Sequence, residues 1–265
     1  MTSPTSETSL APVSAEVVWF SGDDALRFLD DLISQEIADM KPGDTRRSLL
    51  LGPQGKLEFV LWVVRDEGRI GLMTEPGRAE ELATALGRYR IRVDVEIAPE
   101  ADDVSVVVGD WDGYDVSWAG VRRTLVIGKR PELPIMPAMD YDALRIRAGE
   151  PLWGVDVGEG TIPHESSLVP VSVDFAKGCY LGQELVARID SRGGNAPRRL
   201  LLVDGEGADL APGPLTRDGD EAGVVTSASG QLGLAMVKRA VEVGETVQAS
   251  GSPVVVRDLP AKTPG

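Results

Sequence analysis

The 265-residue chain is poor in the residues that build metal centres and disulfides. It contains one cysteine and one histidine, whereas a structural zinc site takes four protein ligands and an iron-sulfur cluster is generally held by four. A single cysteine also excludes an internal disulfide. We therefore expect no metal centre within this chain. The expected location is a reducing compartment, the cytoplasm.

Long apolar runs and positive charge are also scarce. The longest apolar run, Phe59 to Val64, is much shorter than the ~20 residues of a membrane-spanning helix, so no membrane association is predicted. The formal net charge is −15 and the sequence pI is about 4.5. Because nucleic-acid backbones are bound by distributed Lys and Arg, direct contact with nucleic acid is not expected.

What remains is a composition typical of a folded protein with a substantial core. Hydrophobic residues make up 42% of the chain, and the length suits two or three compact units. The apolar periodicity mixes helical and alternating patterns, which predicts an α+β fold. A capping box at Ser21 and Asp24 marks the first helix. The expected helices cover residues 25–33 and 78–86, and the expected strands cover 49–51, 57–64, 91–97, 104–108 and 122–127.

The pattern changes after Pro197 to short strands separated by Gly, Pro and Asp. Strands are expected at 199–203, 222–226, 232–237 and 253–256, a spacing typical of a small antiparallel barrel. The predicted organisation is a disordered tail over 1–12, an α+β region over 13–197 and a C-terminal β-barrel over 198–258. The α+β region divides into subdomains 20–130 and 140–197, with the N-terminal strand as a candidate member of the second. Residues 259–265 are expected to form a loose tail.

The most informative segment places the only cysteine beside a lysine and between two glycines. Helical spacing after Gly182 predicts a helix from about Leu181, whose first N–H groups would face Cys179. A thiolate would be favoured there by the helix end and by Lys177. The alternative is that Cys179 is a small buried hydrophobe. We call residues 177–184 the signature segment: Lys177-Gly178-Cys179-Tyr180-Leu181-Gly182-Gln183-Glu184.

Basic residues gather around this segment in an otherwise acidic chain. Residues 177–199 contain five Lys and Arg against two Asp and Glu, a net charge of +3. Such an island indicates a small anionic ligand, for which Lys177, Arg188 and Arg192 are candidate contacts. The alternative is that these are solvated charges on a helix. Glu184 falls in the first turn, where a carboxylate stabilises the helix end irrespective of catalysis.

The signature segment resembles the K-G-C-[FY]-x-G-Q-E motif of the YgfZ family of folate-binding proteins, relatives of the glycine-cleavage aminomethyltransferase. The likeness extends over about residues 15 to 257. Further similar segments, in the same order as in the family, are Ser21-Gly22-Asp23-Asp24-Ala25, Tyr141-Asp142-Ala143-Leu144-Arg145-Ile146 with Gly149 and Pro151, Ile162-Pro163 with Leu168, Val186-Ala187-Arg188, Arg192-Gly193 with Asn195, and Gly223-Val224-Val225-Thr226-Ser227.

This resemblance implies an aminomethyltransferase-like folate-binding fold, with tetrahydrofolate or another folate as cofactor. It implies an accessory role in iron-sulfur cluster assembly or repair and in iron-sulfur-dependent tRNA modification, with iron-sulfur proteins as partners. Cys179 and Lys177 are the implied reactive residues. The implied folate contacts are Tyr141, Gly178, Tyr180, Gly182, Gln183, Glu184, Arg188 and Arg192.

Two departures from the relatives keep other functions open. Aminomethyltransferases carry an acidic pair where this chain has Glu58 followed by Phe59, which puts amine chemistry in doubt. A family aromatic near the N-terminus falls on Ala15, so that contact is missing or is made by Trp19. The alternatives are a tetrahydrofolate-dependent aminomethyl or one-carbon transferase using Glu58, and a folate-independent scaffold. His164 is expected to be structural, and the sequence leaves open whether the protein has catalytic turnover.

Overall fold

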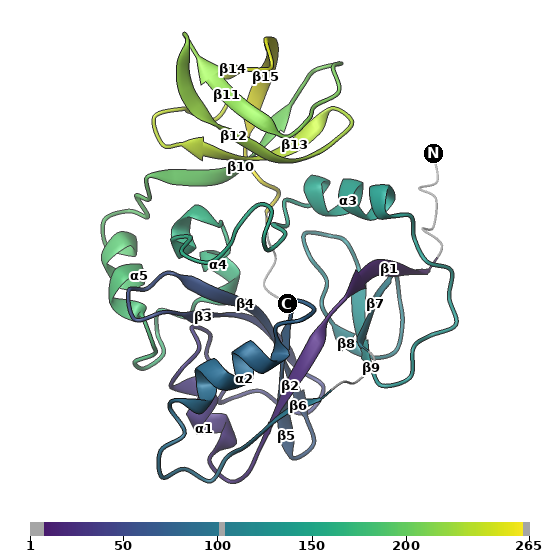
Figure 1. The fold of residues 1–265 in the computed structure, drawn as a ribbon, viewed down its shortest axis with the longest axis vertical. Coiled ribbons are helices and arrows are strands. Elements are labelled where there is room, and N and C mark those ends of the chain that lie inside the picture. The colour runs from purple at the N-terminus through teal and green to yellow at the C-terminus, as the bar shows by residue number, and fades with distance from the viewer. Residues whose placement is uncertain (1–7, 101–103, 262–265) are drawn as a thin grey trace.

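The structure is a computed structural model that describes residues 8–100 and 104–261 (Figure 1). Its N-terminal half contains a five-stranded antiparallel sheet with the strand order β3-β4-β5-β2-β6. The strands are β2 (Glu16–Ser21), β3 (Thr45–Leu51), β4 (Leu57–Asp66), β5 (Arg69–Thr74) and β6 (Glu96–Glu100).

Side chains alternate between the two faces of this sheet, and each face is covered by a different layer. On β2, Val18 and Phe20 enter the core beneath α1 (Ala25–Asp30) and α2 (Ala79–Gly87). The intervening Val17 and Trp19 pack on the opposite side, against a second sheet. This second sheet has the order β1-β7-β9-β8 and consists of β1 (Ser9–Ser14), β7 (Val104–Val108), β8 (Tyr114–Asp115) and β9 (Arg123–Ile127).

The segment after β9 crosses the molecule and carries short helices. Its extended part lies beside β1, where the N–H of Leu10 donates to the Pro134 carbonyl. The helices pack a core that includes Leu49 and Leu51 of β3 and Val186 of α5. They are α3 (Ala138–Arg147), the 3₁₀ turn η1 (Pro163–Glu165), α4 (Val169–Ser172) and α5 (Gln183–Asp190).

The C-terminal quarter is a closed antiparallel barrel with the order β10-β13-β12-β11-β14-β15, drawn at the top of Figure 1. Closure leaves no unpaired strand edge. Ile146 of α3 packs on Leu200, Leu234 and Met236 of the barrel, and α3 lies beneath the barrel in Figure 1. The strands are β10 (Arg198–Asp204), β11 (Gly213–Arg217), β12 (Asp220–Ser229), β13 (Leu232–Lys238), β14 (Thr246–Ala249) and β15 (Ser252–Arg257).

The predicted α+β class with a C-terminal β-barrel is confirmed. The hairpin around residues 52–55 pairs Leu51 with Leu57, and α2, β7 and β9 lie where they were expected. The barrel has two strands, β11 and β14, that the sequence pattern did not indicate. Within the described part of the chain, no helix is both long and apolar enough to cross a membrane.

Four sequence expectations are wrong in detail. Residues 9–12 belong to β1 rather than to a disordered tail, while residues 1–7 and 262–265 lie outside the described part. That N-terminal strand pairs with β7 and not with the subdomain 140–197. The capping box is absent because the Asp24 carboxylate accepts the Asp94 N–H instead. The strand expected over 91–97 begins only at Glu96, since Arg92 has a φ of 56°, which interrupts an extended conformation.

Candidate functional site

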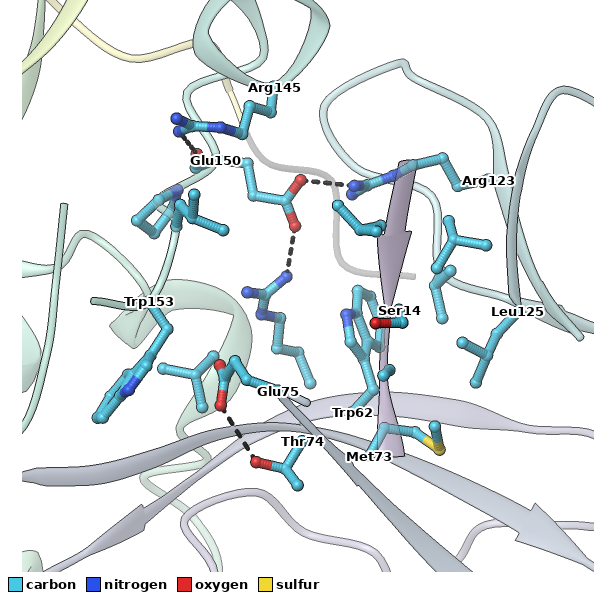
Figure 2. A pocket seen from close by; sticks show the side chains of 18 of the residues that line it. Ser14, Trp62, Met73, Thr74, Glu75, Arg123, Leu125, Arg145, Glu150 and Trp153 are labelled. Atoms are coloured by element: carbon cyan, nitrogen blue, oxygen red, sulfur yellow. Dashed lines mark hydrogen bonds and ion pairs between the residues drawn. The ribbon is translucent and has the colours of Figure 1, made fainter. Parts of the chain in front are cut away.

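A cavity of about 170 Å³ lies where the two N-terminal sheets meet α3 and the loop that follows it. We call it the central cavity; Figure 2 shows it from close by. Its wall combines apolar and aromatic side chains with a few charged groups, as ligand cavities generally do. The residues used below are Ala15, Arg47, Val60, Trp62, Met73, Thr74, Glu75, Arg123, Tyr141, Arg145, Glu150 and Trp153.

A buried carboxylate between two buried guanidinium groups forms the centre of the cavity wall. Glu150 Oε1 accepts from Arg47 Nη1 at 2.8 Å, and Glu150 Oε2 lies 2.6 Å from Arg123 Nη1. Although burial alone would raise the pKa of Glu150, Arg123 and Arg47 hold that pKa at about 2. The three groups carry a net charge of +1, so one positive charge is not balanced within the triad.

The two arginines make fewer hydrogen bonds than their burial requires. Their side chains are only 7 to 8% exposed, yet Arg47 Nε, Arg123 Nε and Arg123 Nη2 have no hydrogen-bond partner among the described residues. Arg47 is held in place because its guanidinium lies over the rings of Trp62 and Trp118, 5.2 and 4.6 Å from the ring centroids. A buried unpaired donor costs about 1–3 kcal/mol, and such groups indicate a missing acceptor.

Tyr141 and Glu75 add two further polar groups to the cavity. The Tyr141 hydroxyl accepts from Arg123 Nη1 at 3.2 Å, and burial raises its pKa although Arg123 opposes the shift. Glu75 follows the last residue of β5, and its Oε2 accepts from the Thr74 hydroxyl at 3.1 Å. Burial raises the pKa of Glu75, with its own backbone N–H, Thr74, Arg78 and Arg47 acting in the opposite direction.

Arg145 connects the cavity wall to the barrel. Its Nη1 donates to Asp156 at 2.8 Å and its Nη2 donates to the Ser227 hydroxyl of β12 at 2.8 Å. Asp156, whose side chain is fully buried, also accepts from the Ser227 hydroxyl. The position of the barrel and the shape of the cavity therefore depend on one buried hydrogen-bond network.

The signature segment lies elsewhere, against the hairpin of β3 and β4, and Lys177 anchors it. The Lys177 side chain is 1% exposed. Its ammonium donates to the carbonyls of Asp30, Ile33 and Gln35 at 2.7, 3.1 and 2.9 Å, and to the Asp30 carboxylate at 3.1 Å. In this arrangement the ammonium group faces main-chain oxygens rather than a ligand or the neighbouring thiol.

Gly182 and Tyr180 also serve as packing residues. Gly182 has a φ of 77° and precedes α5, and a Cβ there would lie 2.6 Å from the Gly52 carbonyl oxygen. Only glycine therefore permits this contact between the helix and the hairpin. Tyr180 is buried in the core that also contains Val60, and burial raises its pKa to about 12. The Gln183 side chain accepts the Tyr180 N–H.

Cys179 is exposed, so it is not the buried hydrophobe of the alternative interpretation. It does not line the central cavity, and neither does any other residue of the signature segment. Gly178 is exposed beside it. The exposed Arg188 forms an ion pair with Glu184 one helical turn earlier, and Arg192 is exposed at the end of α5.

The predicted ligand contacts thus fall into two places. Tyr141 lines the central cavity as expected, and Ala15 lines it too, whereas Trp19 is buried in the core between the sheets. Glu58 lies in a separate groove, where burial and then Glu159 raise its pKa. His164 borders another groove beside the barrel, and burial lowers its pKa.

Sequence reasoning missed the residues that give the cavity its chemistry. Arg47, Trp62, Glu75, Arg123 and Glu150 come from five different strands or loops and form no motif. One signal was present: Arg47 and Arg123 each begin a run of strand residues whose side chains are otherwise apolar or small. A charged residue on the buried face of a strand indicates a partner or a ligand.

Comparisons with known proteins agree with this architecture. Residues 198–262 match the CAF17 C-terminal β-barrel domain family. The chain is 24% identical over 290 residues to an iron-sulfur cluster assembly factor IBA57 homologue, mitochondrial, of Pyricularia oryzae, covering 91% of this chain and 73% of the relative. It is 22% identical over 227 residues to the tRNA-modifying protein YgfZ of Escherichia fergusonii, covering 72% and 69%.

A solved structure extends the likeness to the whole fold. The glycine cleavage system aminomethyltransferase T from Bartonella henselae aligns with a TM-score of 0.82 at 18% identity, over 96% of this chain and 86% of that one. The chain therefore has an aminomethyltransferase-like fold with a CAF17-type barrel, and its predicted resemblance to the YgfZ family and to aminomethyltransferases is confirmed.

Proposed function

We propose that this protein binds tetrahydrofolate in the central cavity and, through Cys179, supports the assembly or repair of iron-sulfur proteins. The observation that carries the proposal is the central cavity itself, where buried unpaired guanidinium donors stand among apolar and aromatic walls. The names of the relatives, an iron-sulfur cluster assembly factor and a tRNA-modifying protein, supply the cellular role.

The residues present fit a folate. A cavity of ~150 Å³ admits a single aromatic ring, so the central cavity, at about 170 Å³, has room for one ring of a folate. Trp62 and Trp153 offer flat apolar surfaces, while Arg47 and Arg123 offer hydrogen-bond donors. A folate combines a flat polar ring with an anionic tail, so both kinds of wall have a counterpart in the ligand.

The signature segment has the properties of a rigid support for an exposed thiol. Lys177 fixes the chain before Cys179, and Gly182 fixes the chain after it. The thiol is exposed between them. We assign Cys179 to transient contact with an iron-sulfur cluster or with the protein that receives it, the cluster being cargo. Effects on tRNA modification follow through iron-sulfur enzymes, and dependence on a free thiol favours the cytoplasm.

Two measurements test the proposal. Calorimetry with tetrahydrofolate is expected to give saturable heat with the wild-type protein, whereas a folate-independent scaffold gives none. Cells lacking the related gene are then complemented with wild type, Cys179→Ala, and Ala176→Ser as an exposed neighbouring control. Iron-sulfur enzyme activity is expected to recover with wild type and the control only. Equal rescue by Cys179→Ala removes the thiol from the mechanism.

A second candidate is a tetrahydrofolate-dependent aminomethyl or one-carbon transferase, favoured by the whole-chain similarity in fold to an aminomethyltransferase. Glu58, the carboxylate expected for this chemistry, lies outside the central cavity. Turnover of tetrahydrofolate with an amine donor, abolished in Glu58→Gln, supports this function. The absence of turnover across amine donors, in a protein that binds tetrahydrofolate, rules it out.

A further inference from the structure

A short stretch of chain, residues 33–35, lies along β3, which is an edge strand of its sheet. Ile33 forms an isolated antiparallel bridge with Leu50, and the Ser34 N–H donates to the Leu49 carbonyl at 3.0 Å. Ser34 is fully buried. We call residues 33–35 the edge segment. Its hydrogen bonds extend on one side to β3, which forms part of the wall of the central cavity, and on the other side to the signature segment.

The hydroxyls of two buried serines fix the edge segment to β3. The Ser34 Oγ accepts the Leu49 N–H at 2.9 Å, and the Ser48 Oγ accepts the Gln35 N–H at 3.0 Å. Ser48 is fully buried and follows Arg47, which lines the central cavity. A movement of β3 at Arg47 therefore acts directly on the edge segment, because buried hydrogen bonds are costly to leave unmade.

The edge segment also holds the chain that leads to Cys179. Lys177 donates to the first and third carbonyls of the edge segment at 3.1 and 2.9 Å. The Asp174 N–H donates to the second carbonyl, that of Ser34, at 3.0 Å. All three carbonyls of the edge segment are thus bonded to the chain just before the exposed thiol.

The short helix α4, which precedes this chain, is bonded to the edge segment as well. The Ser34 Oγ donates to the Ser172 carbonyl at 2.5 Å, and Gln35 Nε2 donates to the Val171 carbonyl at 3.3 Å. α4 lies beside β3 in Figure 1. The edge segment therefore connects β3 to the start and to the end of the stretch between α4 and the thiol. Closely packed elements of this kind transmit a displacement rather than absorb it.

We infer that the edge segment couples occupancy of the central cavity to the reactivity of Cys179. A ligand that contacts Arg47 restrains β3, and the hydroxyls of Ser34 and Ser48 pass the restraint to the edge segment. The chain that carries the thiol is then held in one conformation. This inference rests on the proposed function and adds its regulation, since tetrahydrofolate determines when the exposed thiol is free to react. Coupling between two sites is reciprocal, so a group attached to Cys179 also changes the affinity of the cavity.

The first measurement is the rate at which iodoacetamide alkylates Cys179, with and without saturating tetrahydrofolate. The chain contains one cysteine, so the rate reports this thiol alone. In wild type the ligand is expected to slow alkylation about fivefold, at the lower end of typical coupling. In Ser34→Ala and Ser48→Ala, which remove hydrogen bonds between β3 and the edge segment, the rate is expected to be the same with and without ligand. Two serine variants are compared so that the test survives if one of them does not fold.

The second measurement is the tetrahydrofolate affinity of each protein by calorimetry, before and after alkylation. Alkylation is expected to weaken binding about fivefold in wild type and to leave it unchanged in Ser34→Ala and Ser48→Ala. The control is Ser105→Ala, at a buried serine of β7 that does not line the central cavity. This control is expected to behave as wild type in both measurements.

Equal slowing of alkylation in wild type and in the serine variants of the edge contact means that the ligand acts on the thiol by another route. That result overturns the inference and leaves folate binding intact. The inference is also wrong if tetrahydrofolate binds to wild type in the calorimeter and does not change its alkylation rate. If wild type does not bind tetrahydrofolate, the proposed function fails and the inference fails with it.

Discussion

The signature segment and the central cavity both contain buried cations, but the two regions differ in how those cations are satisfied. Lys177 donates to four oxygens from its own chain. Arg47 and Arg123 share one carboxylate, and three of their nitrogens have no hydrogen-bond partner within residues 8–100 and 104–261. A buried charge whose hydrogen bonds are all made within the chain stabilises the fold, whereas one with unpaired N–H groups requires a further acceptor. The signature segment, although it is a recognisable motif, therefore serves largely to stabilise the fold. The central cavity, which no sequence motif marks, carries the polar groups suited to binding.

The largest expected effect is a loss of stability when Lys177 of the signature segment is replaced. Lys177→Met removes an ammonium from four acceptors and leaves the Asp30 carboxylate without its cation, which is expected to cost about 3–5 kcal/mol. Urea denaturation followed by circular dichroism measures the loss. The control is Lys41→Met, at an exposed lysine, where the change is expected to stay within about 0.5 kcal/mol. Equal stability of both variants contradicts the structural role of Lys177.

Glu150, in the wall of the central cavity, is expected to make the free energy of unfolding depend on pH in the acid range. The pKa of Glu150 is about 2 in the folded chain, below its ordinary value of 4.5. Its stabilising contribution is therefore fully present above pH 4.5 and is lost as the pH falls from 4.5 to 2. The difference corresponds to about 3 kcal/mol. Unfolding free energies of wild type and Glu150→Gln, measured across that range, test this.

Because other carboxyl groups also titrate between pH 4.5 and 2, the informative quantity is the difference in unfolding free energy between wild type and Glu150→Gln. Glu150→Gln is expected to be less stable at pH 7, since two buried guanidinium groups lose their counter-charge. The gap is expected to narrow towards pH 2, when Glu150 itself becomes protonated. A gap that stays constant with pH shows that Glu150 is not held ionised by Arg47 and Arg123.

Much of the fold was predictable because it depends on local patterns. The turn Gly52-Pro53-Gln54-Gly55 between two apolar runs predicted the hairpin of β3 and β4, and helical spacing predicted α2. The wrong predictions concern residues whose conformation depends on a partner that is distant in the sequence. The Asp24 carboxylate accepts from the Asp94 N–H. Residues 9–12 form a strand because they pair with β7. Local sequence contains no information about such partners.

The site was predictable only in part, for the same reason. Tyr141, which lines the central cavity, and the exposed Cys179 were singled out because they stand in recognisable motifs. Arg47, Glu75 and Glu150 come from separate elements, and only the meeting of two sheets and a loop places them around one cavity. Lys177 shows the opposite error, since its place in a motif predicted a ligand contact, whereas its side chain contacts residues 30–35.

A smaller loss of stability is expected when Gly182 of the signature segment is replaced, and Gly178 of the same segment provides the matched control. Gly182→Ala places a methyl group 2.6 Å from the Gly52 carbonyl oxygen at a φ of 77°, which is expected to cost about 2 kcal/mol. Gly178→Ala meets no atom within 4 Å and needs no positive φ, so its stability is expected to change by less than about 0.5 kcal/mol. Thermal denaturation of the two variants is the measurement, and similar losses in both contradict the close packing of Gly182 on the hairpin.

The smallest expected effect concerns binding rather than stability. Tyr141→Phe removes the hydroxyl that accepts from Arg123 Nη1 and leaves that nitrogen with Glu150 as its remaining partner. A ligand acceptor can replace the hydroxyl, so the loss in tetrahydrofolate affinity is expected to be about tenfold at most, corresponding to about 1.4 kcal/mol. Calorimetry on Tyr141→Phe, beside Tyr89→Phe at an exposed tyrosine, measures the change. If Tyr141→Phe binds tetrahydrofolate with the affinity of wild type, neither the Tyr141 hydroxyl nor the Arg123 N–H that it accepts from takes part in binding.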